Sequence, residues 1–351
     1  MNNLSIIINK LSQQHSLTND EYKMLLLECS KDDVDHLARL ARKETEKIYG
    51  KNIYIRGLIE ISNYCKNDCY YCGIRASNTS CDRYRLTDDD ILECCKEGYA
   101  LGFRTFVLQG GEDPALTDDI ICNLVSKIKE LYPDCAITLS LGERSKESYK
   151  KMKQAGADRY LLRHETATAE HYALLHPSKM SFDNRIRCLY DLRNLGFQVG
   201  CGFMVGSPEQ TPDMLAEELK FIETFKPDMC GIGPFIPHVA TKYHNYTAGS
   251  VDMTCLLLSI IRLIHPCVLL PATTALGTLA PNGREKGILS GANVIMPNLS
   301  PASVRKKYMI YDNKLSDGDE SASALDSIKN KINSIGYNII TSRGDVYKPK
   351  K

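Results

Sequence analysis

The chain has 351 residues, 14 cysteines and a formal net charge of +1 at pH 7. This length allows one large α/β barrel or two smaller domains, and the near-neutral charge predicts no nucleic-acid partner. No apolar run reaches the roughly eighteen residues of a membrane span, and the first ten residues do not resemble a signal peptide. We therefore expect a cytoplasmic protein in a reducing compartment, where thiols are metal ligands or stay buried.

Helices come first in the predicted order of elements. Residues 1–50 are rich in Lys, Glu and Leu, and Asp32 and Asp33 are expected to start the second helix. An apolar strand is predicted over 53–61, followed by a long loop that holds three cysteines. Thr87 then opens a helix with acidic residues in its first turn, where they favour the positive end of the helix dipole.

Strand and helix patterns alternate along the rest of the chain. Strands are predicted at 105–109, 136–141, 159–163, 198–205, 229–235, 267–270 and 293–296, and helices at 116–131, 145–155, 182–195, 211–225, 250–264, 282–290 and 323–336. Apolar strands without strict alternation indicate a parallel sheet covered on both faces. About eight such units predict a (β/α)8 TIM barrel. The expected organisation is an N-terminal helical segment over 1–50, the barrel over 51–311, and a C-terminal helix and tail over 312–351.

The loop after the first strand carries the chemistry that is easiest to interpret. Cys65, Cys69 and Cys72 have the spacing C-x3-C-x2-C, with Tyr71 directly before the last thiol. Three thiolates can hold three irons of a [4Fe–4S] cluster and leave the fourth iron for a chelating ligand. This is the signature of radical S-adenosylmethionine (SAM) enzymes. A zinc site with Cys81 as the fourth ligand, or unrelated buried thiols, are the alternatives.

Polar residues end most of the predicted strands, and in a barrel of this kind those ends form the active site. Taken singly they are weak signals, because His164 can be structural and Arg163 can simply pair with Glu165. Together they should gather at one end of the barrel. They are the residues at 109–113, Thr138, Ser140, Glu143, the residues at 163–166, Ser207, His238, Thr273, Thr274 and Asn298.

Several of these residues suit the groups of SAM. The missing side chains of Gly110 and Gly111 let backbone carbonyls, next to Glu112, approach the amino group of SAM. Arg185 suits its carboxylate, because a guanidinium can bind a carboxylate bidentately. Glu165 suits the ribose hydroxyls or the amino group, and Tyr71 can contact adenine.

Further blocks of the sequence resemble the HydE family, the radical SAM maturases of [FeFe]-hydrogenase. The resemblance runs from about residue 53 to 311 and rests on the blocks 83–85, 108–114, 139–143, 155–167, 231–238, 271–278 and 291–298. It implies a full barrel closed below by the N-terminal helices. It implies a SAM site formed by Tyr71, Thr138, Ser140, Glu165 and Arg185. It also implies an internal cavity with Arg163, Met229, Thr273 and Thr274 at its anion end, and with Gln109, Met296 and Tyr308 nearer SAM.

The resemblance also implies a function and partners. The enzyme would cleave SAM reductively to a 5′-deoxyadenosyl radical in the assembly of the di-iron subcluster of the hydrogenase H-cluster. Its substrate would be a small anionic iron–carbonyl–cyanide–cysteine complex. Reduced ferredoxin or flavodoxin would supply the electron, and the other hydrogenase maturases would be partners.

Two departures from the family pattern are visible. No cysteine follows Cys267, so the second cluster that many HydE sequences bind near the C-terminus is expected to be absent. Gly110 also stands where Ser is expected. A related radical SAM mutase or synthase, of the methylornithine synthase or biotin synthase type, is the alternative enzyme. A non-enzymatic Fe–S or zinc module is a third hypothesis, which cleavage of SAM would exclude.

Overall fold

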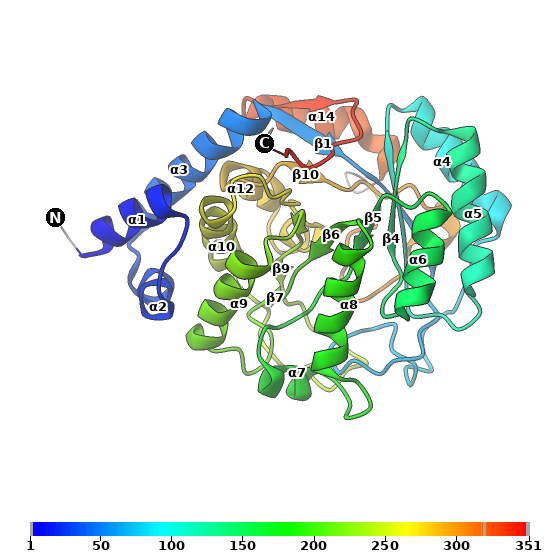
Figure 1. Ribbon diagram of the computed structural model, residues 1–351, viewed down its shortest axis with the longest axis horizontal. Helices are drawn as coiled ribbons and strands as arrows, with labels where there is room; N and C mark the ends of the chain where they lie inside the picture. The colour runs from blue at the N-terminus through cyan, green and yellow to red at the C-terminus, as the bar shows by residue number, and fades with distance from the viewer. Residues whose placement is uncertain (1–2, 317, 319–320, 349–351) are drawn as a thin grey trace.

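Parallel strands form a closed barrel in the computed structural model, which describes residues 3–316, 318 and 321–348 (Figure 1). Six strands pair in the order β2 (Gly57–Ser62), β3 (Thr105–Gly110), β4 (Ala136–Ser140), β5 (Arg159–Leu161), β6 (Gln198–Cys201) and β8 (Met229–Cys230). Bridges from Met229 to Leu269 and from Pro271 to Val294 continue the wall to β10 (Val294–Ile295). That strand pairs with β1 (Asn52–Ile55), which completes the ring and confirms the predicted (β/α)8 barrel.

Helices cover the outside of this barrel. They are α4 (Asp88–Ala100), α5 (Asp118–Leu131), α6 (Lys146–Gln154), α8 (Phe182–Asn194), α9 (Pro212–Phe225), α10 (Val251–Ile264) and α12 (Gly283–Leu289). Each of the first six begins after a Ser or Thr whose side chain accepts a hydrogen bond from the first turn. These caps explain why the predicted starts of these helices agree with the observed starts to within a few residues. None of the described helices is both long and apolar enough to cross a membrane.

Three short helices were not predicted from the sequence. They are α7 (Ala169–Leu175), α11 (Thr274–Leu279) and α13 (Ala302–Arg305), and none has a hydrogen bond from a capping side chain. Without that signal, and with only one or two turns each, they have no clear pattern in the sequence.

Several predicted strands are interrupted. The strand expected over 53–61 is β1 and β2, which pair with different neighbours on either side of Arg56. The strands expected over 198–205 and 229–235 continue after a break as the short pair β7 (Met204–Val205) and β9 (Gly233–Pro234). Gly202 marks this break, because its φ is +153° and a Cβ there would lie 2.0 Å from the carbonyl oxygen of Gly231. The strand expected over 267–270 takes part only through isolated bridges.

The N-terminal segment differs from its expected form and place. It contains three helices, α1 (Asn3–Gln14), α2 (Asn19–Glu28) and α3 (Lys31–Tyr49), and Asp32 and Asp33 lie in the first turn of the third. In Figure 1 these helices lie beside α9 and α10, along the outer wall. Most of the segment therefore lies along the outer wall, and only the end of α3 reaches the lower end of the barrel, where Tyr49 packs with Leu269, Val294 and Val346.

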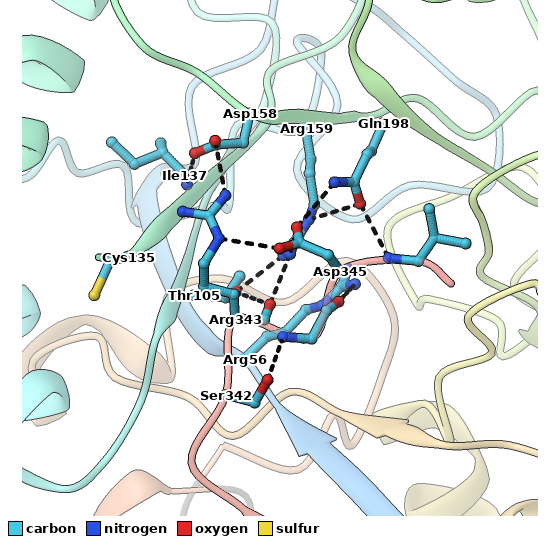
Figure 2. A network of polar contacts seen from close by, with 12 residues as sticks. Arg56, Thr105, Cys135, Ile137, Asp158, Arg159, Gln198, Ser342, Arg343 and Asp345 are labelled. Atoms are coloured by element: carbon cyan, nitrogen blue, oxygen red, sulfur yellow. Dashed lines mark hydrogen bonds and ion pairs between the residues drawn. The ribbon is translucent and has the colours of Figure 1, made fainter. Parts of the chain in front are cut away.

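The C-terminal segment also covers that end. After η2 (Ala322–Ala324) and α14 (Leu325–Ser334), the strand β11 (Asn338–Ile340) pairs with β1. The chain then crosses the N-terminal ends of the barrel strands, where Figure 2 shows a network of charged groups. Asp345 accepts from Arg159 at 2.7 Å and from Gln198 at 2.9 Å, while Arg343 donates to Asp158 at 2.9 Å. These contacts tie the tail to the first residues of β5 and β6, which is a role that no motif in the tail predicts.

This network gives a first prediction, for the variant Asp345→Asn. Its main partner Arg159 is 3% exposed and would lose its carboxylate, so we expect a loss of about 1–3 kcal/mol in the free energy of unfolding. Asp345 is itself partly exposed, which favours the lower end of this range. Chemical denaturation at pH 7 measures the effect.

The stabilisation by Asp345 is expected to depend on pH, because it requires the ionised carboxylate. Burial opposes ionisation of Asp345, but Arg159 outweighs it and lowers the pKa of Asp345 far below its usual value. The stabilisation is present above the unfolded pKa of about 3.9 and is lost as the pH falls through the folded pKa. The difference between parent and variant should thus be constant at neutral pH and shrink below about pH 4. Asp326→Asn, at an exposed pair with Lys329, is the control and should have almost no effect. An equal loss in both variants would contradict the prediction.

Candidate active site

The cysteine loop lies between β2 and α4, at the C-terminal end of the barrel. Arg83 shapes this loop by donating to the carbonyl oxygens of Ile74 at 2.8 Å and Arg75 at 2.6 Å. Arg85 forms a bidentate pair with Asp113 at 2.6 and 3.0 Å, which ties the end of the loop to the turn after β3. The block 83–85 that stands out in the sequence therefore holds the cysteine loop in place.

All three thiols of the motif line one central cavity. Burial raises the pKa of Cys65, Cys69 and Cys72, that of Cys72 to about 12, and neighbouring thiols raise the values of the last two further. Thiolates held close together repel one another, and a bound metal group favours their ionised form. In the described part of the chain, no three His, Cys, Asp or Glu side chains converge on one metal ion. Three thiols around a shared space fit three irons of a [4Fe–4S] cluster.

The Gly-Gly-Glu turn after β3 packs against the cysteine loop. A Cβ on Gly111 would lie 2.2 Å from the carbonyl oxygen of Tyr64 and 2.8 Å from Cβ of Cys65. The glycine is therefore required by the close approach of the cysteine loop, in addition to any approach of a ligand. The Glu112 carboxylate accepts from the backbone N–H of Glu143 at 2.9 Å. The turn thus joins the loop to the end of the next strand.

Charged side chains face one another on the side of the cavity formed by β5 and α8. Arg185 donates to the carboxylate of Glu143 at 2.6 Å and to the carbonyl oxygen of Arg163 at 2.9 Å. Nη2 of Arg163 and Oε2 of Glu165 lie 3.3 Å apart, but without the geometry of a hydrogen bond. Glu165 has a φ of +68°, which is rare for a residue with a side chain. Strain of this kind is common at functional sites.

Tyr71 is fixed by a neutral histidine. Burial and the charge of Arg185 lower the pKa of His176 to about 3. Nδ1 of His176 lies 3.0 Å from the carbonyl oxygen of Tyr172, so it carries the proton, and Nε2 is free to accept. The hydroxyl of Tyr71 lies 3.2 Å from that Nε2 and donates to it. This bond holds the Tyr71 ring at the edge of the cavity, next to Cys72.

The cavity has a volume of about 340 Å³ and brings together nearly all of the expected site residues. Its lining includes Cys65, Cys69, Tyr71, Cys72, Gln109, Gly110, Gly111, Glu112, Ser140, Arg163, Glu165, Arg185, Met229, Thr273, Thr274, Met296 and Tyr308. The strand-end residues Glu143, His164, Ser207, His238 and Asn298 lie outside this lining, and so does Thr138, the one expected SAM contact that it lacks. Thr138 lies two residues before Ser140, deeper in the barrel, and lines a separate small cavity with Arg56 and Arg159. A contact between Thr138 and SAM therefore stays a prediction.

A buried ion pair in the cavity wall was missed by the sequence analysis. The ammonium of Lys314, from the segment after the barrel, lies 2.8 Å from Oε1 of Glu60 on β2. Asn298 donates to the other carboxylate oxygen at 2.9 Å. A single acidic residue inside the apolar run of β2 is the signal that could have pointed to Glu60. Lys314 has no such signal, because its position depends on the path of the tail.

Comparisons with known proteins agree with this geometry. Residues 59–222 match the model of the radical SAM superfamily. The chain is 42% identical to the [FeFe]-hydrogenase maturase subunit HydE of Thermotoga maritima, over 86% of this chain and 85% of that protein. It is 28% identical to 3-methylornithine synthase of Methanosarcina barkeri, over 90% and 89% of the two chains.

The fold is also similar to that of a solved structure. The crystal structure of methylornithine synthase (PylB) superposes with a TM-score of 0.84 at 27% identity and covers 95% of this chain and 97% of that one. The sequence match to HydE is higher and spans most of both proteins. This chain therefore belongs to the radical SAM superfamily and, within it, to the HydE family.

Proposed function

We propose that this chain is a HydE-type maturase that acts in assembly of the di-iron subcluster of an [FeFe]-hydrogenase. The observation that carries the proposal is the 42% identity to a hydrogenase maturase over most of both chains. It is supported by a cavity whose lining contains both the cluster cysteines and the Arg163 guanidinium, of which Nε and Nη2 make no hydrogen bond among the described residues. When bound, a [4Fe–4S] cluster supplies the electron that cleaves SAM to a 5′-deoxyadenosyl radical.

Residues next to the cysteines are suited to hold SAM. Arg185 sits at the cavity wall with its charge balanced by Glu143, and it can take a carboxylate as a further partner. Glu165 offers a carboxylate to hydroxyl or amino groups, and Tyr71 offers an aromatic face. Gly110, Gly111 and Ser140 contribute backbone and hydroxyl groups at the ends of β3 and β4.

The part of the cavity lining around Arg163 and Thr273 is suited to a small anion. Nε and Nη2 of Arg163 and Oγ1 of Thr273 have no hydrogen-bond partner among the described residues. Buried donors without partners are costly, so a ligand that accepts from them is favoured. Thr274, Met229 and Met296 complete this end of the lining. We infer that an anionic iron–carbonyl–cyanide–cysteine complex binds here, between the guanidinium and the SAM side.

A groove beside the cysteine loop suits an acidic electron donor. It has a volume of about 430 Å³, and its lining includes the basic residues Lys66, Arg144, Lys179 and Arg187 together with Glu112 and Glu143. Positive surfaces attract negatively charged partners and speed their association. We therefore propose reduced ferredoxin or flavodoxin as the donor. The other hydrogenase maturases would supply the substrate and receive the product.

Methylornithine synthase activity is the second candidate, because of the fold similarity to PylB. Two assays separate the candidates. The gene is expressed in a host that has an [FeFe]-hydrogenase and the other maturases but lacks its own HydE, and hydrogen evolution is measured. The purified, reconstituted enzyme is also incubated with SAM, a reductant and L-lysine, and methylornithine is measured. Restored hydrogen evolution without methylornithine supports the proposal. Methylornithine formation without restored hydrogen evolution would overturn it.

A further inference from the structure

A buried carboxylate lies between the barrel wall and the outer helix α9. Glu218 is fully buried, on a helix whose other inward side chains include Leu215, Leu219 and Ile222. Burying a charge among apolar groups is unfavourable unless hydrogen bonds compensate for lost water. An apolar side chain at such a position is often at least as stabilising. Packing alone therefore does not account for Glu218.

The hydrogen bonds of Glu218 lead to the active-site turn. Oε1 accepts from the backbone N–H of Ala167 at 2.6 Å, and Oε2 lies 2.7 Å from Nε2 of His164. The backbone N–H of Gly202 donates to Nδ1 of the same ring at 3.3 Å. Nδ1 is thus an acceptor, which fixes the tautomer: Nε2 carries the proton and donates it to Glu218.

The turn held in this way presents two charged residues to the cavity. His164 points outward to α9, and its neighbours Arg163 and Glu165 line the cavity on the other side of the wall. Glu165 keeps its φ of +68° while its N–H donates to the carbonyl oxygen of Gly202 at 3.0 Å. A strained residue persists only where its surroundings over-determine it. His164 and Glu218 hold both ends of the turn around it.

We propose that His164 and Glu218 are positioning residues, which hold the turn at 163–167 so that Glu165 and Arg163 face bound SAM and substrate. The inference rests on the proposed SAM site. It adds that the affinity for SAM depends on a carboxylate outside the barrel, which touches no ligand. Phe203 and Phe221 pack beside the His164 ring and keep water from the hydrogen bonds.

The hydrogen bonds by which His164 and Glu218 hold the turn are called the clamp below. Glu218→Gln tests the clamp with almost no change in side-chain volume. The amide has only one oxygen, so its NH2 must face either the N–H of Ala167 or the Nε2–H of His164. Moving the ring proton to Nδ1 would only create the same conflict with the N–H of Gly202. One donor therefore always faces another donor. His164→Gln is the milder second variant, because its amide can still donate to Glu218 but no longer accepts from Gly202. Glu217→Gln, the exposed neighbour, is the matched control.

Two measurements on these variants test the proposal. Hydrogen exchange of the cluster-free protein should be at least about tenfold faster at residues 165–167 in Glu218→Gln than in the parent, because the amide of Ala167 or its neighbours loses protection. In the reconstituted enzyme the KM for SAM should rise about tenfold with kcat nearly unchanged, a shift equivalent to weaker binding. His164→Gln should show a smaller change in the same direction, and Glu217→Gln none.

Each outcome has a defined meaning. A folded Glu218→Gln with unchanged exchange and unchanged KM would overturn the clamp. So would a loss of kcat that follows the folded fraction while KM stays constant, since that is the effect of a purely structural residue. Should Glu218→Gln not fold, the same criteria apply to His164→Gln. If the parent itself neither binds nor cleaves SAM, the proposed function fails, and the exchange measurement still decides whether the turn is clamped.

Discussion

Replacing Cys65, Cys69 or Cys72 with alanine is expected to abolish reductive cleavage of SAM. Each thiol borders the shared space at the mouth of the cavity, and each would ligate a different iron of one [4Fe–4S] cluster. Loss of one ligand removes the only protein bond to that iron. Formation of 5′-deoxyadenosine from SAM under dithionite, measured by chromatography, tests each variant and the triple variant.

The iron content gives an independent measure of the same site. The reconstituted parent should bind about four irons and four sulfides per chain, and the triple variant almost none. Cys94→Ala and Cys95→Ala are the controls, because both thiols are buried in α4 and pack in the hydrophobic core. They should retain both the iron and the activity. Activity in the triple variant, or about eight irons in the parent with about four remaining in that variant, would contradict a single cluster held by these cysteines.

The barrel could be predicted because its signals are local. Six of the outer helices begin at Ser or Thr caps, and the apolar strands between them have the composition of a parallel sheet. The breaks in the strands could not be predicted from the local sequence in the same way. The break at Gly202 depends on the carbonyl oxygen of Gly231 in the neighbouring strand, a contact that exists only after the strands pair.

The candidate site was predictable to the extent that strand ends define it. Parallel strands bring their carboxyl ends together, so Gln109, Ser140 and Arg163 had to meet at one end of the barrel. Thr138 lines a separate cavity, because a difference of two residues along β4 moves a side chain deeper into the barrel while keeping it on the same face. Depth within a barrel is set by the shear of the whole sheet, which a strand's own sequence does not contain.

Contacts made by the tail were beyond sequence reasoning. Lys314 reaches Glu60 across 254 positions of sequence, and Asp345 reaches Arg159 across 186. No spacing rule links such residues. Both pairs connect the C-terminal segment to barrel strands, one in the cavity wall and one at the opposite end. The tail therefore belongs to the structure of the barrel, although its sequence shows only a helix.

Arg163→Ala is expected to cripple hydrogenase maturation while SAM cleavage stays largely intact. The guanidinium presents Nε and Nη2 to the cavity without hydrogen-bond partners, and Thr273 presents its hydroxyl to the same cavity. Each charge-assisted hydrogen bond to the anion contributes about 1.5–3 kcal/mol, so the loss of even one lowers the affinity by about 10- to 150-fold. Arg185 should keep its own place, because it bonds to the backbone carbonyl of residue 163, which alanine retains.

The ion pair between Arg163 and Glu165 suggests another role for Arg163, and the same measurements test it. If Arg163 serves mainly to orient Glu165 across their 3.3 Å contact, removing it should disturb the SAM side, and cleavage and maturation would fall together. Arg163→Lys separates the two roles further, because a lysine keeps the charge but lacks the fork that binds an anion bidentately. Maturation should remain low in Arg163→Lys if the guanidinium recognises the substrate. Recovery of maturation in Arg163→Lys would show that a positive charge beside Glu165 is all that the site requires.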